Sequence, residues 1–327
     1  MEQGDFPLPA VAGDSVSSML QRLRVHSWVA GLSTAGGRWR VPLPPGPGGF
    51  HAVLDGRMLM MIEGATHELR AGDVAIVVGG GRHFVGDHPE SPLIDMRRMI
   101  DKEMVRRHAG LHLGEGEPTV RFFGGMIVFD GPGGPRLRSA LPPVMIMRAS
   151  EEPPHALVPS VIRLLAHQVG DAAPGTHAVM THLVTILFVE AVRRALNART
   201  ARGAATGGWA QAVLDEHIGP ALAMLHASPG RAWSLADMAN EAGLSRTVFH
   251  ERFTALVGAP PASYLRQHRL ELAADLLRHS DMALRDIASR AGYSTQGAFC
   301  SAFRKWSGAA PGEFRERAAA IRAATAL

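Results

Sequence analysis

SLADMANEAGLS at residues 234–245 is repeated in outline by ALRDIASRAGYS at residues 283–294. In both segments apolar or small residues recur at helical spacing, a glycine follows, and a serine comes next. A glycine allows the positive φ of a tight turn, and serine is a favoured N-terminal cap of a helix. Each segment is therefore predicted to be a helix-turn-helix motif, and together they predict an all-α domain at residues 209–327.

The first motif has a full set of helix signals. Ser234 and Asp237 form the pattern of a capping box, Gly243 supplies the turn, and Ser245 can cap the second helix. The residues expected to be buried are Leu235, Met238, Ala239, Ala242, Val248, Phe249 and Phe253. The other face of the second helix carries side chains that can hydrogen-bond base edges or phosphates, namely Arg246, Thr247, His250 and Glu251.

The second motif repeats this design. Gly292 supplies the turn, Ser294 is the expected cap, and Phe299, Phe303 and Trp306 are expected to anchor the second helix. Its DNA-facing residues are predicted to be Thr295, Gln296, Ser301, Arg304 and Lys305. A connecting helix over residues 261–279 should hold the two motifs at a fixed separation. Two such motifs on one chain predict double-stranded DNA as the partner.

Residues 209–317 resemble the DNA-binding domain of the AraC/XylS family of bacterial transcription regulators. The resemblance rests on WSL at 233–235, GLSR at 243–246, YLRQHRL at 264–270, AGYS at 291–294 and AFR at 302–304. It implies a bihelical domain whose two recognition helices enter successive major grooves on one face of the duplex. It also implies a promoter or operator as the DNA target and, for an activator, RNA polymerase as a further partner. Nothing in the sequence separates activation from repression.

The two recognition helices are predicted to contribute unequally. Ser301 stands where many members of this family carry an arginine or lysine, and Gly297 and Ala298 bring no hydrogen-bonding side chain. The first helix should therefore discriminate bases, whereas Arg304 and Lys305 should hold phosphate and set the register.

Composition frames the rest of the chain. Its 327 residues suggest two domains, and a formal net charge of +4 is too small to argue for DNA binding without the local pattern. The single cysteine, Cys300, excludes an internal disulfide, fits a reducing cytosol, and is expected to be a small, partly buried side chain. Residues 1–16 show no export signal, and no apolar run has membrane-spanning length. We therefore expect a cytoplasmic protein with no membrane contact.

The N-terminal half has a sequence pattern typical of an all-β domain. Short apolar runs alternate with glycine and proline between Trp39 and Phe129; they occupy residues 50–54, 58–62, 74–78, 83–85 and 120–129. LRAGDVAIVVGGGRH at residues 69–83 resembles the second motif of a cupin, and FHAVLDG at 50–56 fits with it as part of a cupin-type sensor of AraC-like regulators. The resulting fold class is α+β multidomain, with an N-terminal cupin-like β-barrel, a helical connector and a C-terminal all-α domain with two helix-turn-helix motifs.

The barrel offers candidates for an effector pocket. They are Trp39, Phe50, His51, Arg57 and His83, and ordinary core or rim positions explain them as well as ligand contact does. Metal-binding cupins present two close histidines and a glutamate from the first motif and one histidine from the second, and here that set is incomplete. An alternative cluster of His51, His67, His83 and His88 stays open, but we expect no metal and no cofactor.

Helical patterns follow the barrel at residues 157–170 and 176–197. The second pattern is apolar on more than one side, through Val179, Leu183, Ile186, Leu187, Val189 and Val192. Self-association as a homodimer and burial against the barrel both explain it. The expected domains are a sensor at 1–150, connector and dimerisation helices at 151–200, a linker at 201–208 and the DNA-binding domain at 209–327.

The sequence thus predicts a DNA-binding transcription regulator whose barrel senses a small effector or mediates dimerisation. Two alternatives remain, a cupin-type metal-dependent enzyme fused to a DNA-binding domain and an effector-independent DNA-binding scaffold. The incomplete ligand set disfavours the enzyme. A bound small molecule or metal in the purified protein would separate the classes.

Overall fold

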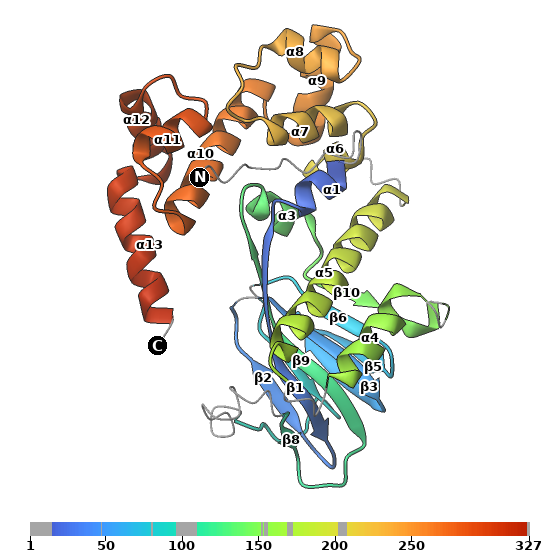
Figure 1. Ribbon diagram of the computed structural model, residues 1–327. Helices are drawn as coiled ribbons and strands as arrows, with labels where there is room; N and C mark the ends of the chain where they lie inside the picture. The colour runs from blue at the N-terminus through green and yellow to red at the C-terminus, as the bar shows by residue number, and fades with distance from the viewer. Residues whose placement is uncertain are drawn as a thin grey trace. The chain divides into compact units, whose positions relative to one another are not determined.

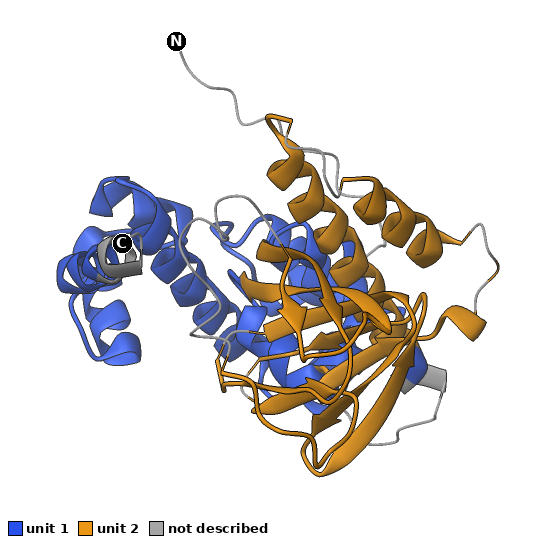
Figure 2. Cartoon of the chain, turned by 90° about the horizontal axis from the view of Figure 1, so that it is seen from below, with its two compact units in different colours: residues 1–24, 130–140, 198–327 blue, residues 25–129, 141–197 orange. Residues whose placement is uncertain are grey.

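The computed structural model describes residues 15–46, 48–79, 81–95, 110–151, 153, 156–168, 173–201 and 208–325. The chain divides into two compact units, shown in Figure 2. The orange unit, called here the sheet unit, contains residues 25–129 and 141–197. The blue unit, called here the helical unit, contains residues 1–24, 130–140 and 198–327. The chain therefore crosses between the units at residues 24–25, 129–130, 140–141 and 197–198.

The sheet unit is built from two β-sheets. One has six strands in the order β10-β6-β3-β9-β1-β8, and the other has four in the order β2-β7-β4-β5. The strands are β1 (Arg24–Ala35), β2 (Arg40–Leu43), β3 (Gly48–Asp55), β4 (Arg57–Ile62), β5 (Ala65–Arg70), β6 (Val74–Val77), β7 (His83–Gly86), β8 (His112–Leu113), β9 (Val120–Asp130) and β10 (Val144–Met147). At the centre of the larger sheet β3 pairs antiparallel with both β6 and β9.

The predicted mixed α+β architecture is confirmed, but the closed barrel is wrong. Among the described residues, no ladder joins an edge strand of one sheet to the other sheet. The edge strand β8 has only two residues, which leaves little backbone to continue the pairing. The apolar runs predicted as strands lie in strands except for Val78, which follows the end of β6, whereas β1 and β10 fall outside the predicted β region.

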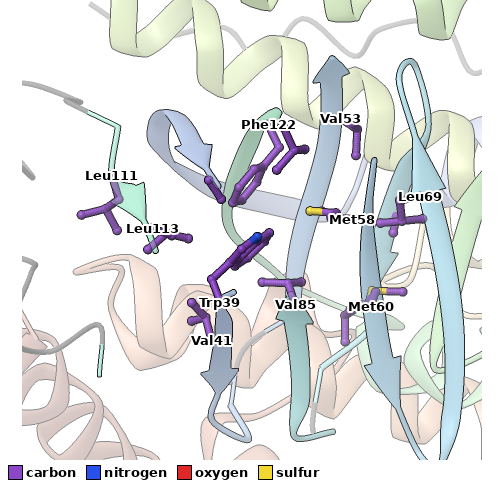
Figure 3. Close-up of a cluster of buried hydrophobic side chains, with 14 of the residues drawn as sticks. Trp39, Val41, Val53, Met58, Met60, Leu69, Val85, Leu111, Leu113 and Phe122 are labelled. Atoms are coloured by element: carbon purple, nitrogen blue, oxygen red, sulfur yellow. The ribbon is translucent and has the colours of Figure 1, made fainter. Parts of the chain in front are cut away.

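The core of this unit lies between the two sheets (Figure 3). The Trp39 ring stacks on Phe122 with centroids 5.8 Å apart, and both side chains are buried. Val53 pairs with Phe122 across β3 and β9, so both point to this inner face. The four-stranded sheet contributes Val41, Met58, Met60, Leu69 and Val85. Each buried apolar side chain of this size stabilises the fold by roughly 1.5–3 kcal/mol.

Two helices cover the outer face of the six-stranded sheet, α4 (Leu157–His167) and α5 (Thr176–Ala201) (Figure 1). Phe188 of α5 lies against Phe129 with ring centroids 5.0 Å apart, and Ser27 Oγ donates to the Thr181 carbonyl at 3.2 Å. Both predicted connector helices are therefore confirmed. Of the predicted linker, residues 202–207 lie outside the described residues.

The helical unit contains the predicted all-α domain. Its helices are α6 (Trp209–Leu214), α7 (Ile218–Ala227), α8 (Leu235–Glu241), α9 (Arg246–Val257), α10 (Pro261–His279), α11 (Leu284–Arg290), α12 (Gln296–Ser307) and α13 (Pro311–Thr325). Helix α10 has the bounds that the sequence predicts, and its Leu265, Leu270 and Leu277 are buried. In the described part of the chain we find no helix with the length and hydropathy needed to cross a membrane.

Two segments from the N-terminal half also belong to the helical unit: α1 (Ser15–Leu20) and α3 (Gly134–Ala140). The Arg136 Nη1 atom lies 2.7 Å from Glu271 Oε2 on α10, and its guanidinium lies over the Tyr264 ring at 4.7 Å. At the start of β1, Arg24 forms an ion pair with the buried Asp275, also on α10. Helix α10 is therefore held by two separate segments of the N-terminal half, through Arg24 and Arg136.

Candidate nucleic-acid interface and sensor site

The first motif is capped as the sequence predicts. The Ser234 Oγ accepts from the Asp237 amide at 3.1 Å, and the Asp237 carboxylate accepts from the Ser234 amide at 2.9 Å. Gly243 has a φ of 64°, which lets the chain turn into α9. Phe249 and Phe253 are fully buried, with Phe253 edge-on to Tyr264 of α10. These contacts fix α9 on the connecting helix.

The opposite face of α9 is open to solvent. Arg246, Thr247, His250 and Glu251 are all exposed, as a DNA-reading face requires. Two predicted core positions are wrong, because Val248 is 47% and Leu235 is 38% exposed. Each sits in the first turn of its helix, where the other motif residues do not cover it. Val248 is therefore an exposed apolar side chain beside the predicted DNA-facing residues of α9.

The second motif differs in its cap. Helix α12 begins at Gln296, and its cap is Thr295, whose Oγ1 accepts from the Ala298 amide at 3.2 Å. The prediction that Ser294 caps this helix is wrong, because the helix starts later. Phe299 and Phe303 are buried, while the expected anchor Trp306 is 38% exposed with its ring beside Phe303. The remaining predicted readers, Gln296, Ser301, Arg304 and Lys305, are exposed.

Three cationic side chains exposed on α9 and α12 have no carboxylate partner in the part of the chain that the structure describes. Within the described residues, Arg246, Arg304 and Lys305 form no ion pair. By contrast, Arg252 on the inner side of α9 donates to Asp215 at 2.7 Å. Burial alone would raise the pKa of the Asp215 carboxyl. Hydrogen bonds to this carboxylate, first among them the bond from Arg252, have the larger combined effect, so the pKa of Asp215 is lowered. Arg252 is thus neutralised by Asp215, whereas Arg246 and Arg304 have no carboxylate partner among the described residues.

A groove of about 850 Å³ separates the two motifs. Helix α10 forms its floor through Leu265 and Arg266, and the walls carry His250 of α9 and Lys305 of α12. The surface between the predicted DNA-facing residues of the two motifs therefore carries cationic side chains.

A second candidate site lies in the sheet unit, where two predicted histidines meet. His51 of β3 and His83 of β7 belong to different sheets, and their Nε2 atoms lie 3.1 Å apart. Both are buried. Burial, and then the neighbouring His83, lowers the pKa of His51 to about 3; burial also lowers the pKa of His83. The pair is therefore neutral at physiological pH, with one ring donating to the other.

The surroundings decide which ring donates. His83 Nδ1 faces the Gly81 carbonyl at 3.5 Å, and a carbonyl only accepts, so this nitrogen carries the His83 proton. His83 Nε2 is then an acceptor, and His51 Nε2–H must donate to it. His51 Nδ1 is left as an unprotonated acceptor, buried and without a hydrogen-bond partner. This atom is an unsatisfied acceptor inside the unit.

The other predicted pocket residues do not join this pair. Trp39 is part of the core between the sheets. Phe50 precedes His51 on β3 and so points to the opposite face of the strand, where its ring lies over Gly125. Arg57 is exposed at the start of β4, 3.7 Å from Glu68.

The alternative four-histidine cluster does not assemble in the described residues. His67 lies on β5, opposite Met60, and the His88 ring accepts from the Glu90 amide. Among the described residues, no three histidine, cysteine, aspartate or glutamate side chains come together as a metal site would require.

Sequence reasoning missed the residues that fix α10. Arg136 and Glu271 are 135 positions apart, and no local pattern connects them. It also missed the buried rings of His226 and His268, stacked 4.3 Å apart, because single histidines on a helix give no signal of pairing.

Comparison with known proteins agrees with this architecture. Residues 14–197 match the cupin family, and residues 238–317 match a helix-turn-helix domain. A putative AraC-like transcription regulator of Streptomyces lividans is 29% identical over 93% of this chain and 98% of its own length. The regulator AlkR of Acinetobacter baylyi is 28% identical over 82% of this chain and 87% of its own. The DNA-binding domain of AdpA, solved with a target DNA, covers 32% of this chain and 94% of that domain, at 28% identity and a TM-score of 0.31.

The fold and the matches together define the class of protein. The chain belongs to the cupin family through its N-terminal half and is an AraC-type transcription regulator through its two helix-turn-helix motifs.

Proposed function

We propose that this protein is an effector-responsive transcription regulator that places α9 and α12 in two major-groove segments of one promoter duplex. The observation that carries the proposal is the pair of recognition helices on α10, each with an exposed polar face and unpaired cations. Similarity to the putative AraC-like transcription regulator of Streptomyces lividans over 93% of this chain supports the same use of this domain here.

Helices α9 and α12 would make different kinds of contact with the DNA. Base reading falls mainly to α9, through Arg246, Thr247, His250 and Glu251. On α12 the Thr295 hydroxyl is engaged in the cap, and Gly297 and Ala298 have no polar side chain. Gln296 and Ser301 would then make minor base contacts, while Arg304 and Lys305 hold phosphate.

The effector would bind in the sheet unit at His51. Because the free Nδ1 of His51 is an acceptor, the matching ligand group is a hydrogen-bond donor, such as a hydroxyl, an N–H or a protonated acid. A carboxylate or a ketone oxygen would face the lone pair and be rejected. The surrounding core is apolar, so the rest of the effector should be apolar as well. We assign sensing rather than catalysis to this unit.

Two strands would carry the signal along the chain. Strand β1 begins at Arg24 and β9 ends at Asp130, and both residues already belong to the helical unit. Arg24 is paired with Asp275 and Arg136 with Glu271, both on α10. A ligand that shifts β1 or β9 would therefore act on the helix that connects the two recognition motifs.

The connector would pair two copies of the chain. Val179 and Ile186 lie seven residues apart on α5 and are both exposed, as are Leu157 and Leu164 on α4. Each pair forms an apolar stripe that a second copy could bury. A cytoplasmic homodimer of this kind would present four recognition helices to repeated sites near RNA polymerase.

Selection of DNA from a random pool by the full-length protein tests the proposal. We expect enriched duplexes to share two short sequence elements about one helical turn apart. The bases of the element that α9 contacts should vary less than those of the element that α12 contacts. Thr247→Ala and His250→Ala should relax the first element without changing the second. A pool that remains random after repeated selection, with and without donor-bearing apolar compounds, would refute sequence-specific binding.

A further inference from the structure

The two motifs touch one another directly, beside the helix that joins them. The loop before α8 lies against the end of α11: a Cβ at Gly230 would stand 2.9 Å from the Arg290 carbonyl oxygen. A Cβ this close to a carbonyl oxygen would force one of the two backbone segments to shift. Gly230 thus allows a close approach of two backbone segments, one from each motif.

Arg269 of α10 lies between these segments. Its Nε donates to the Pro229 carbonyl and its Nη2 to the Arg231 carbonyl, both at 2.7 Å, so the guanidinium holds the loop of the first motif. On its other side is the turn of the second motif, where a Cβ at Gly292 would stand 2.8 Å from Arg269 Cζ. One side chain therefore contacts both motifs.

A planar guanidinium suits this position. It donates to two carbonyls in fixed directions while presenting a flat face to Gly292, which the single ammonium of a lysine does not reproduce. The neighbouring Arg231 stacks on Trp233 at 4.1 Å, and Trp233 Nε1 donates to the Ser228 carbonyl, so the loop that Arg269 holds is itself ordered.

We propose that Arg269, with Gly230 and Gly292, fixes the separation of the two recognition helices and thereby sets the spacing between the two DNA elements that the protein accepts. Arg269 is a positioning residue in this scheme, since it acts through the motifs rather than on bases. The groove between the motifs, which Arg269 and Gly292 both line, keeps a fixed width for the same reason.

The consequence for binding is preorganisation. Two motifs held at one separation engage two major-groove segments without a further ordering step. Motifs that move independently lose part of this advantage and tolerate altered spacings. The inference rests on the proposed DNA binding only for this spacing effect, because the separation of the helices exists without DNA.

The first experiment therefore uses no DNA. Spin labels are placed on full-length protein at the matching positions Glu251→Cys of α9 and Ser301→Cys of α12, in a Cys300→Ser background, and the distance distribution is measured by pulsed electron resonance. We expect one narrow distribution, broadened by Arg269→Ala, broadened less by Arg269→Lys, and shifted by Gly230→Ala. Two controls should leave it unchanged: Arg285→Ala, at an arginine whose side chain is 83% exposed, and Gly312→Ala, where a Cβ meets nothing within 4 Å.

The second experiment measures affinity for the selected duplex and for duplexes with the spacing changed by one base pair. Arg269→Ala should weaken binding to the original spacing on the order of tenfold and narrow its advantage over the altered spacings, whereas Arg285→Ala should do neither. An Arg269→Ala protein that keeps the wild-type distance distribution would overturn the inference. If the distribution broadens but no duplex binds specifically, the proposed function fails and the positioning role stands. If it broadens while the spacing preference is unchanged, the role of Arg269 in DNA selection is refuted.

Discussion

Removing Arg136 should loosen α10, although Arg136 lies far away in the sequence. Its ion pair with Glu271 is largely buried, with side-chain exposures of 16% and 10%. Breaking a fully buried pair by removing one partner costs about 3–5 kcal/mol, because a charge is left without compensation. Glu271 would keep the Gly133 amide at 3.3 Å and Gln267 Nε2 at 3.1 Å, which offsets part of that loss. The cation–π contact with Tyr264 adds about 1 kcal/mol.

We therefore expect Arg136→Ala to lower the opening free energy of α10 by about 3 kcal/mol, measured by hydrogen exchange of its amides in the full-length protein. Glu271→Gln keeps hydrogen-bonding capacity and should have a smaller effect. The matched control is Arg317→Ala, which breaks an exposed i,i+4 pair with Glu313 and should change stability by less than about 0.5 kcal/mol. If Arg136→Ala affects α10 no more than this control, residues 130–140 do not stabilise the connecting helix and the proposed signal path fails.

Three further outcomes are expected. Ser234→Ala removes the capping box of α8 and should destabilise that helix by about 1 kcal/mol in hydrogen exchange, while Ser289→Ala, at a serine that is also exposed, should not. Burial first, and then nearby charges, lowers the pKa of His268 to about 3 and that of His226 well below 6.5. Between about pH 6.5 and 3 the unfolded chain binds protons that the native state does not, so stability should fall as pH drops through this window. Urea unfolding midpoints measured at about pH 7.5 and about pH 5 check this expectation. A His268→Gln protein whose stability changes with pH as much as that of the wild type would contradict it. Arg246→Ala should cost about 1–3 kcal/mol and relax preference at one position if Arg246 reads a base; a uniform weakening would assign it to phosphate.

The helix-turn-helix motifs were predictable because their signals are local. A cap, a turn glycine and a pair of phenylalanines lie within one motif, and the structure places Ser234, Gly243 and Phe249 as expected. The errors fall at first turns, where burial depends on neighbours that the helical period does not specify. Val248 is exposed for this reason, and α12 starts after Thr295 rather than Ser294.

The N-terminal half was less predictable because its contacts are remote in sequence. Strand β1 contains Ser27, Ser33 and Thr34 and a positive-φ Gly31, so it lacks a continuous apolar run. The arrangement as two sheets, rather than a closed barrel, depends on strand pairings that no local pattern contains. His51 and His83 were both candidates from the cupin resemblance, but only the structure shows that their rings meet and that one nitrogen is left without a partner.

Binding to DNA across a salt series distinguishes a sequence-specific regulator from a protein that binds DNA only through its charge. The full-length protein is titrated onto the duplex selected from the random pool and onto an unrelated duplex of equal length. We expect the selected duplex to bind at least about a thousandfold more tightly, with affinity falling steeply as salt rises because phosphate contacts release counterions. Equal binding to both duplexes, or no binding at low salt with or without donor-bearing apolar compounds, would refute sequence-specific DNA binding.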